Sequence, residues 1–144
     1  MGKKVMVAVG LTDECLKSLE GLKGNPLISD AEITLYHVFR TEVMVNELVP
    51  YPYPGPDDYD SIEKSVKDIL TKLGETITPE GSSFKTKVDF HSDPKMKFTE
   101  FANEQDMNLI CVATRGLSGL KGLFSSSFAD YLNKHASSDI YVIR

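Results

Sequence analysis

Five short apolar runs, rich in β-branched residues, alternate along the chain with longer segments in which apolar residues recur at helical spacing. The runs cover residues 5–9, 33–39, 84–90, 109–113 and 140–143. The amphipathic segments cover residues 13–23, 59–77, 94–105 and 126–135. Strands that alternate with helices predict an α/β protein with a parallel sheet covered on both faces. Right-handed crossovers then give a three-layer doubly wound sandwich.

One domain accounts for the whole chain. Its 144 residues fall within the range of a single domain, and no internal repeat or low-complexity tract divides them. The runs at 5–9 and 109–113 lack polar alternation, which is typical of parallel strands buried on both faces. We therefore expect residues 1–144 to share one sheet.

The connection at residues 41–58 is longer than a minimal one. It carries Pro50, Pro52, Pro54 and Pro56, with tyrosines interleaved. Proline at this spacing excludes a helix and a central strand. We expect a solvent-exposed irregular connection, or else a functional or interface element, since long loops often serve function.

Composition limits the partners. The formal net charge is −5 and the pI about 5.2, which argues against nucleic acid and an anionic membrane surface as partners. No apolar run approaches the roughly 20 residues that a membrane span needs. The two cysteines, Cys15 and Cys111, lack metal-ligand spacing and suit reduced thiols in a cytoplasmic protein. We expect no metal site.

The last third of the chain carries the most informative chemistry. The apolar run 109–113 is followed by the glycine-rich segment 114–122 and then by three consecutive serines at 125–127. A strand, a glycine-rich loop and a helix start form an anion site, because backbone N–H groups and the helix dipole both point at the ligand. The candidate nucleotide- or anion-binding residues are Thr12, Val38, Thr114, Arg115, Gly116, Ser126 and Ser127.

Catalytic residues are not expected. His37 lies inside an apolar strand and is interpreted as a hydrogen-bonded core histidine, and Thr12 as the N-cap of the helix that follows it. The sequence has no nucleophile elbow, zinc-protease motif or P-loop. Nothing pairs a nucleophile with a base.

The ordered motifs resemble the universal stress protein family over nearly the whole chain. The matching segments are the first strand at 5–9, Leu-Tyr-His-Val at 35–38, Ser-Asp-Pro at 92–94, Asp-Met-Asn-Leu-Ile at 106–110, Thr-Arg-Gly-Leu-Ser-Gly-Leu at 114–120 and Lys-His-Ala at 134–136. The resemblance implies a cytoplasmic binding or signalling module in a stress response, with an unidentified protein partner. ATP-binding members of that family carry a glycine, two residues, a glycine, nine residues, then glycine and serine or threonine.

This chain departs from that ATP motif. The motif positions are Ala113, Gly116, Ser126 and Ser127, of which only Gly116 and Ser127 match, and Gly10 stands where the ATP binders have an aspartate. Lost glycines and a lost charged partner together cost about 3–6 kcal/mol, which turns a micromolar site into a millimolar one. We expect weak or altered binding of ATP, AMP or another anion. Tight ATP binding with slow hydrolysis, and no small ligand at all, remain the alternatives.

Two expectations follow for sheet order and assembly. With strands numbered along the chain, the order is 3-2-1-4-5, and the ligand crevice lies between strands one and four, where the order reverses. The last strand, 140–143, is apolar on both faces and lies at a sheet edge. An exposed apolar edge favours a two-fold homodimer through this strand, which the resembled family often uses.

Overall fold

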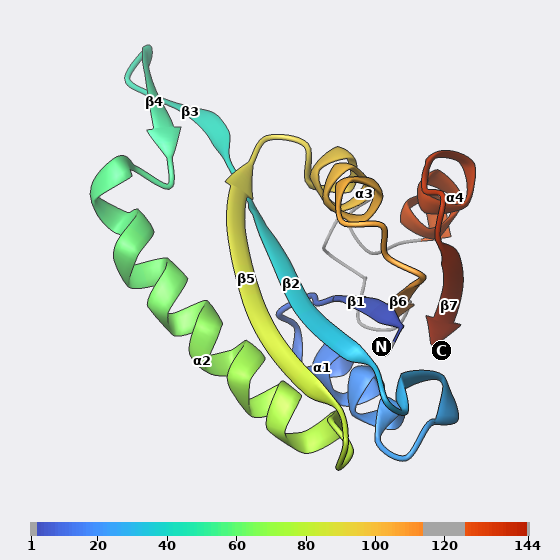
Figure 1. The fold of residues 1–144 in the computed structure, drawn as a ribbon. Coiled ribbons are helices and arrows are strands. Elements are labelled where there is room, and N and C mark those ends of the chain that lie inside the picture. Colours follow the sequence, from blue (N-terminus) through green and yellow to red (C-terminus); the bar gives the residue numbers. More distant parts are fainter. Residues whose placement is uncertain (1–2, 114–125, 144) are drawn as a thin grey trace.

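The computed structural model, which describes residues 3–113 and 126–143, has a five-stranded parallel sheet at its centre (Figure 1). Its strands are β1 (Lys4–Ala8), β2 (Glu32–Arg40), β5 (Ser83–His91), β6 (Leu109–Ala113) and β7 (Asp139–Ile143). The order across the sheet is β5-β2-β1-β6-β7, and every neighbouring pair is parallel. This confirms the predicted order, since these five strands are the first to fifth of the parallel sheet along the chain.

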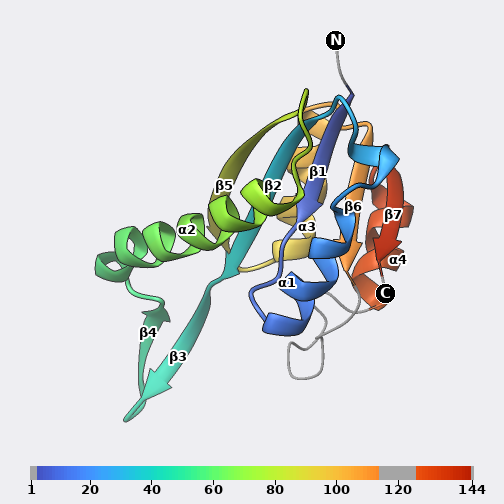
Figure 2. The same cartoon turned by 90° about the horizontal axis from the view of Figure 1, so that it is seen from below.

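Helices cover both faces of the sheet (Figures 1 and 2). They are α1 (Asp13–Leu19), α2 (Tyr59–Ile77), α3 (Pro94–Glu104) and α4 (Ser126–His135), with 3-10 turns η1 (Glu20–Leu22), η2 (Pro26–Ile28) and η3 (Pro56–Asp58). One core cluster joins α1 and α2 to the sheet, and a second joins α3 and α4 to its other face. Alternate strand residues supply the two clusters, because successive side chains of a strand point to opposite faces.

The predicted helix starts follow from capping chemistry. Asp93 caps α3 by accepting a hydrogen bond from the Met96 amide, and Pro94 occupies the first helical position, where no N–H is needed. The predicted segment 13–23 divides, because α1 ends at Leu19 and the 3-10 turn η1 completes it.

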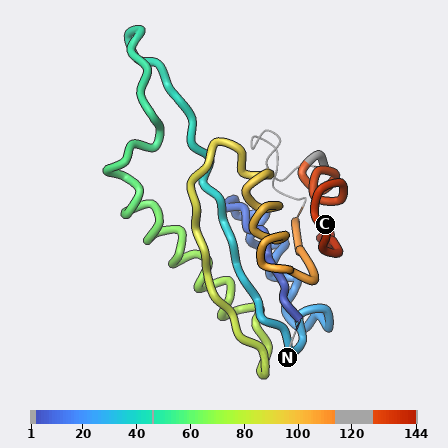
Figure 3. The backbone as a smooth tube through the Cα atoms, turned by 45° about the horizontal axis from the view of Figure 1, so that its top comes forward, coloured from blue at the N-terminus to red at the C-terminus, as the bar shows by residue number. Residues whose placement is uncertain are grey.

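The segment 41–58 is not the irregular connection expected from its prolines. It forms an antiparallel hairpin of β3 (Glu42–Asn46) and β4 (Val49–Tyr53), which projects beyond the end of β2 and then leads back through η3 into α2 (Figures 1 and 3). The hairpin is a separate two-stranded sheet, so both of its strands are edges. Proline is tolerated on an edge, where its missing N–H removes no ladder hydrogen bond.

Candidate functional site

The candidate site is the point where the sheet order reverses. β1 lies between β2 and β6, and Ala8 at the end of β1 pairs in register with Val112 of β6. Figure 2 shows these strands side by side, with α1 beside their carboxyl ends. Open α/β sheets bind ligands in the crevice at such a switch point.

Three hydrogen bonds fix the turn from β1 into α1. Thr12 Oγ1 accepts from the Cys15 amide at 3.2 Å, which confirms Thr12 as the helix N-cap. The Gly10 amide donates to the Cys15 thiol, and burial raises the pKa of that thiol. The Val9 amide donates to the Tyr36 carbonyl at 2.9 Å and extends the pairing of β1 with β2. The contact of Gly10 with Cys15 has no signal in the sequence.

His37 also contacts this turn, from β2. Its Nδ1 lies 2.7 Å from the carbonyl oxygen of Val9, so Nδ1 carries a proton and donates it to that oxygen. The side chain is 5 % exposed, and burial lowers its pKa and keeps the imidazole neutral. The expected hydrogen-bonded core histidine is confirmed.

Val38 lies one residue further along β2, with its side chain on the opposite face. It is fully buried in the cluster under α3 and α4, together with Met6, Ala8 and Tyr36. Thr12 therefore lies in the connection that follows β1, whereas Val38 lies within the neighbouring strand β2 and its side chain packs in the core.

The remaining candidate residues are only partly described. Thr114, Arg115 and Gly116 lie outside the described residues, and so do the side chains of Ser126 and Ser127. The backbone of α4 begins at Ser126, as the sequence predicts. Along the chain, α1 is the first helix after β1 and α4 is the first helix after β6.

A cluster of polar side chains lies under α3, and the sequence pattern does not predict it. The Tyr36 hydroxyl donates to Asp89, and Lys87 Nζ lies 3.7 Å from Asp89 and 5.4 Å from the Phe101 ring centre. Burial, and then the hydrogen bond to Asp89, raise the pKa of Tyr36 well above its usual range. This group joins β2 to the edge strand β5, away from the crevice. Sequence alternation places its members on one face but does not pair them.

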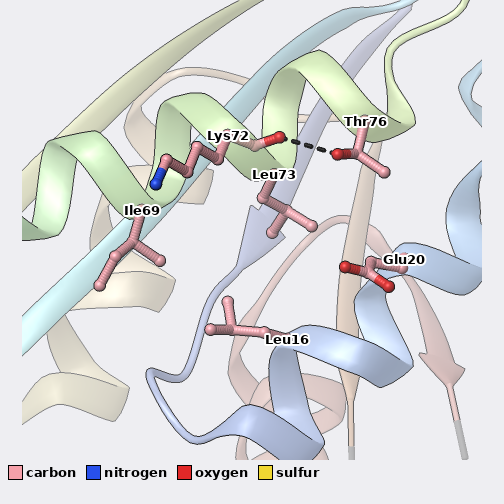
Figure 4. A pocket seen from close by; sticks show the side chains of 6 residues that line it. All are labelled: Leu16, Glu20, Ile69, Lys72, Leu73 and Thr76. Atoms are coloured by element: carbon pink, nitrogen blue, oxygen red, sulfur yellow. Dashed lines mark hydrogen bonds between the residues drawn. The ribbon is translucent and has the colours of Figure 1, made fainter.

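A pocket of about 250 Å³ opens between α1 and α2 (Figure 4). Its lining residues are Leu16, Glu20, Ile69, Lys72, Leu73 and Thr76. The Thr76 hydroxyl is already bonded to the Lys72 carbonyl at 2.9 Å. The pocket lies between α1 and α2 and shares no residue with the predicted site.

Two searches of the described residues bear on other kinds of site. No group of three or more His, Cys, Asp or Glu side chains that could hold a metal ion occurs in residues 3–113 and 126–143. None of the helices described there is both long and apolar enough to cross a membrane.

Known proteins resemble this chain along its full length. A sequence profile described as the Universal stress protein family matches residues 1–144. The protein YxiE of Bacillus subtilis (strain 168), a universal stress protein, is 26 % identical over 149 residues, covering 100 % of both chains.

Solved structures share the fold at low sequence identity. The universal stress protein UspA of Lactobacillus plantarum superposes with a TM-score of 0.68 at 18 % identity, over 99 % of this chain and 97 % of that one. A family member from Arabidopsis thaliana, solved with AMP bound, gives 0.61 at 21 % identity, over 98 % and 90 %.

Proposed function

Because the chain belongs to the universal stress protein family, we propose that it is a cytoplasmic binding and signalling module of the stress response. Its ligand is an adenine nucleotide or a related anion, bound weakly in the crevice between β1 and β6. The binding groups are Thr12 and the backbone of β2 at Val38, with Thr114, Arg115, Gly116, Ser126 and Ser127.

The observation that carries this proposal is the register of β1 with β6 at the order reversal. It places the carboxyl ends of β1 and β6 side by side, and α1 and α4 are the next helices along the chain after these two strands. Helix amino ends favour anions through free N–H groups and the dipole. Structural neighbours were solved with AMP, cAMP or dAMP bound, which supports a nucleotide as the class of ligand.

Weak binding follows from the departures from the ATP motif. Ala113 ends β6 with its methyl group fully buried in the cluster under α1 and α2. Gly10 supplies no carboxylate where ATP-binding members have an aspartate, and its amide is engaged by Cys15. The site therefore lacks a charged partner for the adenosine moiety. Loss of such a hydrogen bond costs roughly 1.5–3 kcal/mol.

Calorimetry and thermal shift with ATP, AMP and inorganic phosphate test the proposal. We expect dissociation constants in the high micromolar to millimolar range and little preference for adenosine. Low-micromolar ATP affinity, or nucleotide retained through purification, contradicts a degenerate site. Release of phosphate from ATP in the same samples tests the alternative of slow hydrolysis.

A double variant tests the assignment of motif positions. Ala113→Gly with Ser126→Gly restores the two missing glycines and is expected to strengthen ATP binding, and Gly10→Asp is expected to add preference for adenosine. The matched control is Ala31→Gly with Ser83→Gly, at the amino ends of β2 and β5, which leaves affinity unchanged. No gain in the first variant means that the motif positions are wrongly assigned.

For assembly, the proposal is a homodimer through β7. This strand pairs with β6 on one side only, among the described residues, and its Val142 side chain is 41 % exposed. Two copies related by a two-fold axis bring their β7 edges together and remove both exposed edges.

A further inference from the structure

The β3–β4 hairpin, called the arm below (residues 42–53), carries most of the large apolar side chains that are exposed in the described part of the chain. Val43 is 71 % exposed, Val45 66 %, Val49 63 % and Leu48 94 %. These side chains lie on a ribbon that projects from the body of the protein (Figures 1 and 3). Large apolar side chains gathered in the open on one projecting element mark an interaction site.

The register of the arm shows which backbone groups face outward. The strands are joined by the two residues Glu47 and Leu48, both with positive φ, at 50° and 69°. This two-residue loop closes on Asn46 and Val49, which therefore form a hydrogen-bonded pair. Hydrogen-bonded pairs alternate in an antiparallel ladder with non-hydrogen-bonded pairs, called open pairs below. Val45 with Pro50 and Val43 with Pro52 are therefore open pairs.

The two edges of the arm are therefore unequal. In an open pair the N–H and C=O groups point away from the partner strand. On β4 these outward positions are Pro50 and Pro52, which have no N–H, so that edge cannot complete a ladder. On β3 they are Val43 and Val45, which have both groups. No further strand lies along that edge in the described part of the chain.

We propose that the arm is a self-association element, in which the open edge of β3 pairs antiparallel with β3 of a second copy of this chain. The two-fold axis passes at Met44. Val43 then faces Val45 of the second copy, and each such pair exchanges two backbone hydrogen bonds, giving four in all. This proposal is independent of the nucleotide site.

Charge and apolar pattern favour a second copy over another extended chain. In this register Met44 faces its own equivalent, and valine faces valine on both sides of it. Glu42 faces position 46 and Glu47 faces position 41, so no acidic side chain opposes another despite the net charge of −5. Cross-strand apolar pairs of this kind contribute roughly 0.2–1 kcal/mol each, whereas opposed like charges destabilise.

The size of the contact sets its strength. The same register brings the exposed Leu48 at the tip of each arm level with Arg40, at the end of the partner copy's β2. A strand contact of this length buries on the order of 500 Å² per copy, at the small end of specific interfaces. We therefore expect a contact weaker than the β7 dimer, detectable by trapping.

Disulfide trapping tests the register directly. Opposed residues of an open antiparallel pair have Cα atoms about 4.5 Å apart, within the range that a disulfide bridges. Met44→Cys is therefore expected to form a disulfide-linked dimer about tenfold or more faster than Val49→Cys, a control on the blocked strand at a more exposed position (63 % against 40 %). The native cysteines are fully buried and do not compete.

A proline variant tests the edge. Val45→Pro, added to Met44→Cys, removes an outward N–H and no bond within the arm, and is expected to abolish the rapid trapping, whereas Val45→Thr keeps it. Both are made with Val142→Lys, so that the β7 contact is absent. If Met44→Cys is trapped no faster than Val49→Cys, or if Val45→Pro leaves its trapping unchanged, the proposal is overturned. Circular dichroism of each variant confirms that the fold is retained.

Discussion

The imidazole Nδ1 of His37 lies 2.7 Å from the carbonyl oxygen of Val9. This bond joins β2 to the residue that follows β1, on the side of the sheet covered by α1 and α2. The bond holds the turn that runs from Val9 through Gly10 to Thr12, the N-cap of α1. A core histidine thus positions one wall of the candidate crevice.

The stability of the protein should fall in mild acid because of His37. Burial lowers its pKa in the folded state below the value of about 6.5 that it has when unfolded. Between the lowered pKa and about 6.5, the unfolded chain binds more protons, so the free energy of unfolding decreases as the pH falls. The slope is at most about 1.4 kcal/mol per pH unit for one group, and it ends below the folded pKa.

Denaturant unfolding at pH 7, 6 and 5 measures this. His37→Asn keeps an N–H donor near the Nδ1 position and cannot titrate, so the slope assigned to His37 should disappear. His91→Asn is the matched control, at the edge strand β5, where the His91 imidazole accepts a bond from the Asp93 amide. An unchanged slope in His37→Asn contradicts the assignment.

Tyr36 should ionise only when the protein unfolds. Its buried hydroxyl donates to Asp89, and both effects raise its pKa, so stability is complete below the usual value near 10 and is lost as the pH rises above it. In an absorbance titration, one of the six tyrosines should ionise together with loss of structure, and Tyr36→Phe should lack that step.

The same variant should lower stability at pH 7 by about 1–2 kcal/mol, because Asp89 loses its donor but keeps Lys87 and remains partly exposed. Tyr59→Phe, whose ring stacks on Phe90 at 4.2 Å, is the control and should change stability by less than about 0.5 kcal/mol. Equal effects of the two substitutions would show that the Tyr36–Asp89 bond contributes nothing specific.

Gly74→Ala should destabilise the protein although alanine favours helices. A Cβ at Gly74 would lie 2.5 Å from the Phe84 ring and 2.7 Å from Leu35 Cδ1, because α2 approaches the sheet closely there. Overpacking of this kind costs about 1–3 kcal/mol, more than the gain of about 1 kcal/mol in helix propensity. At Gly21, where an added Cβ has nothing within 4 Å, alanine should be tolerated. Thermal unfolding of both variants measures the difference in their stability. A Gly74→Ala variant more stable than the native protein would refute the tight contact.

Val142→Lys should weaken the proposed β7 dimer. A charged side chain on the edge strand is repelled by its equivalent across the two-fold axis. Light scattering at micromolar concentration should give about twice the chain mass for the native protein and a value nearer one chain for the variant. Met96→Lys, on α3 and with a similar exposure of 38 %, should leave the mass unchanged. A monomeric native protein would show that β7 is not the interface.

The hairpin shows where local reasoning failed. Pro50 and Pro52 exclude a central strand, and that inference was correct, yet the segment pairs with residues 42–46. Whether a proline breaks a strand depends on the side toward which its nitrogen points. That direction is set by the register with the partner strand, which a single segment does not contain.

The candidate site was predictable to a different degree at each residue. The cap at Thr12 is local, since it depends only on the three residues that follow, and it was found. The burial of Val38 depends on which helix layer covers its face of β2, and this is fixed by the crossovers. The bond from His37 to Val9 joins residues 28 positions apart in sequence, and only the parallel pairing of β1 with β2 brings them together.

The sequence by itself determined the helices and the parallel strands, and it predicted their order across the sheet. The helices and strands follow from apolar periodicity and capping residues, which act over short stretches of chain. Only the tertiary structure decided that the arm is a hairpin with one open edge, that Tyr36 bonds to Asp89, and that Gly74 touches Phe84. Each of these depends on the register between segments far apart in sequence, because packing and strand pairing choose among arrangements that the local pattern leaves equivalent.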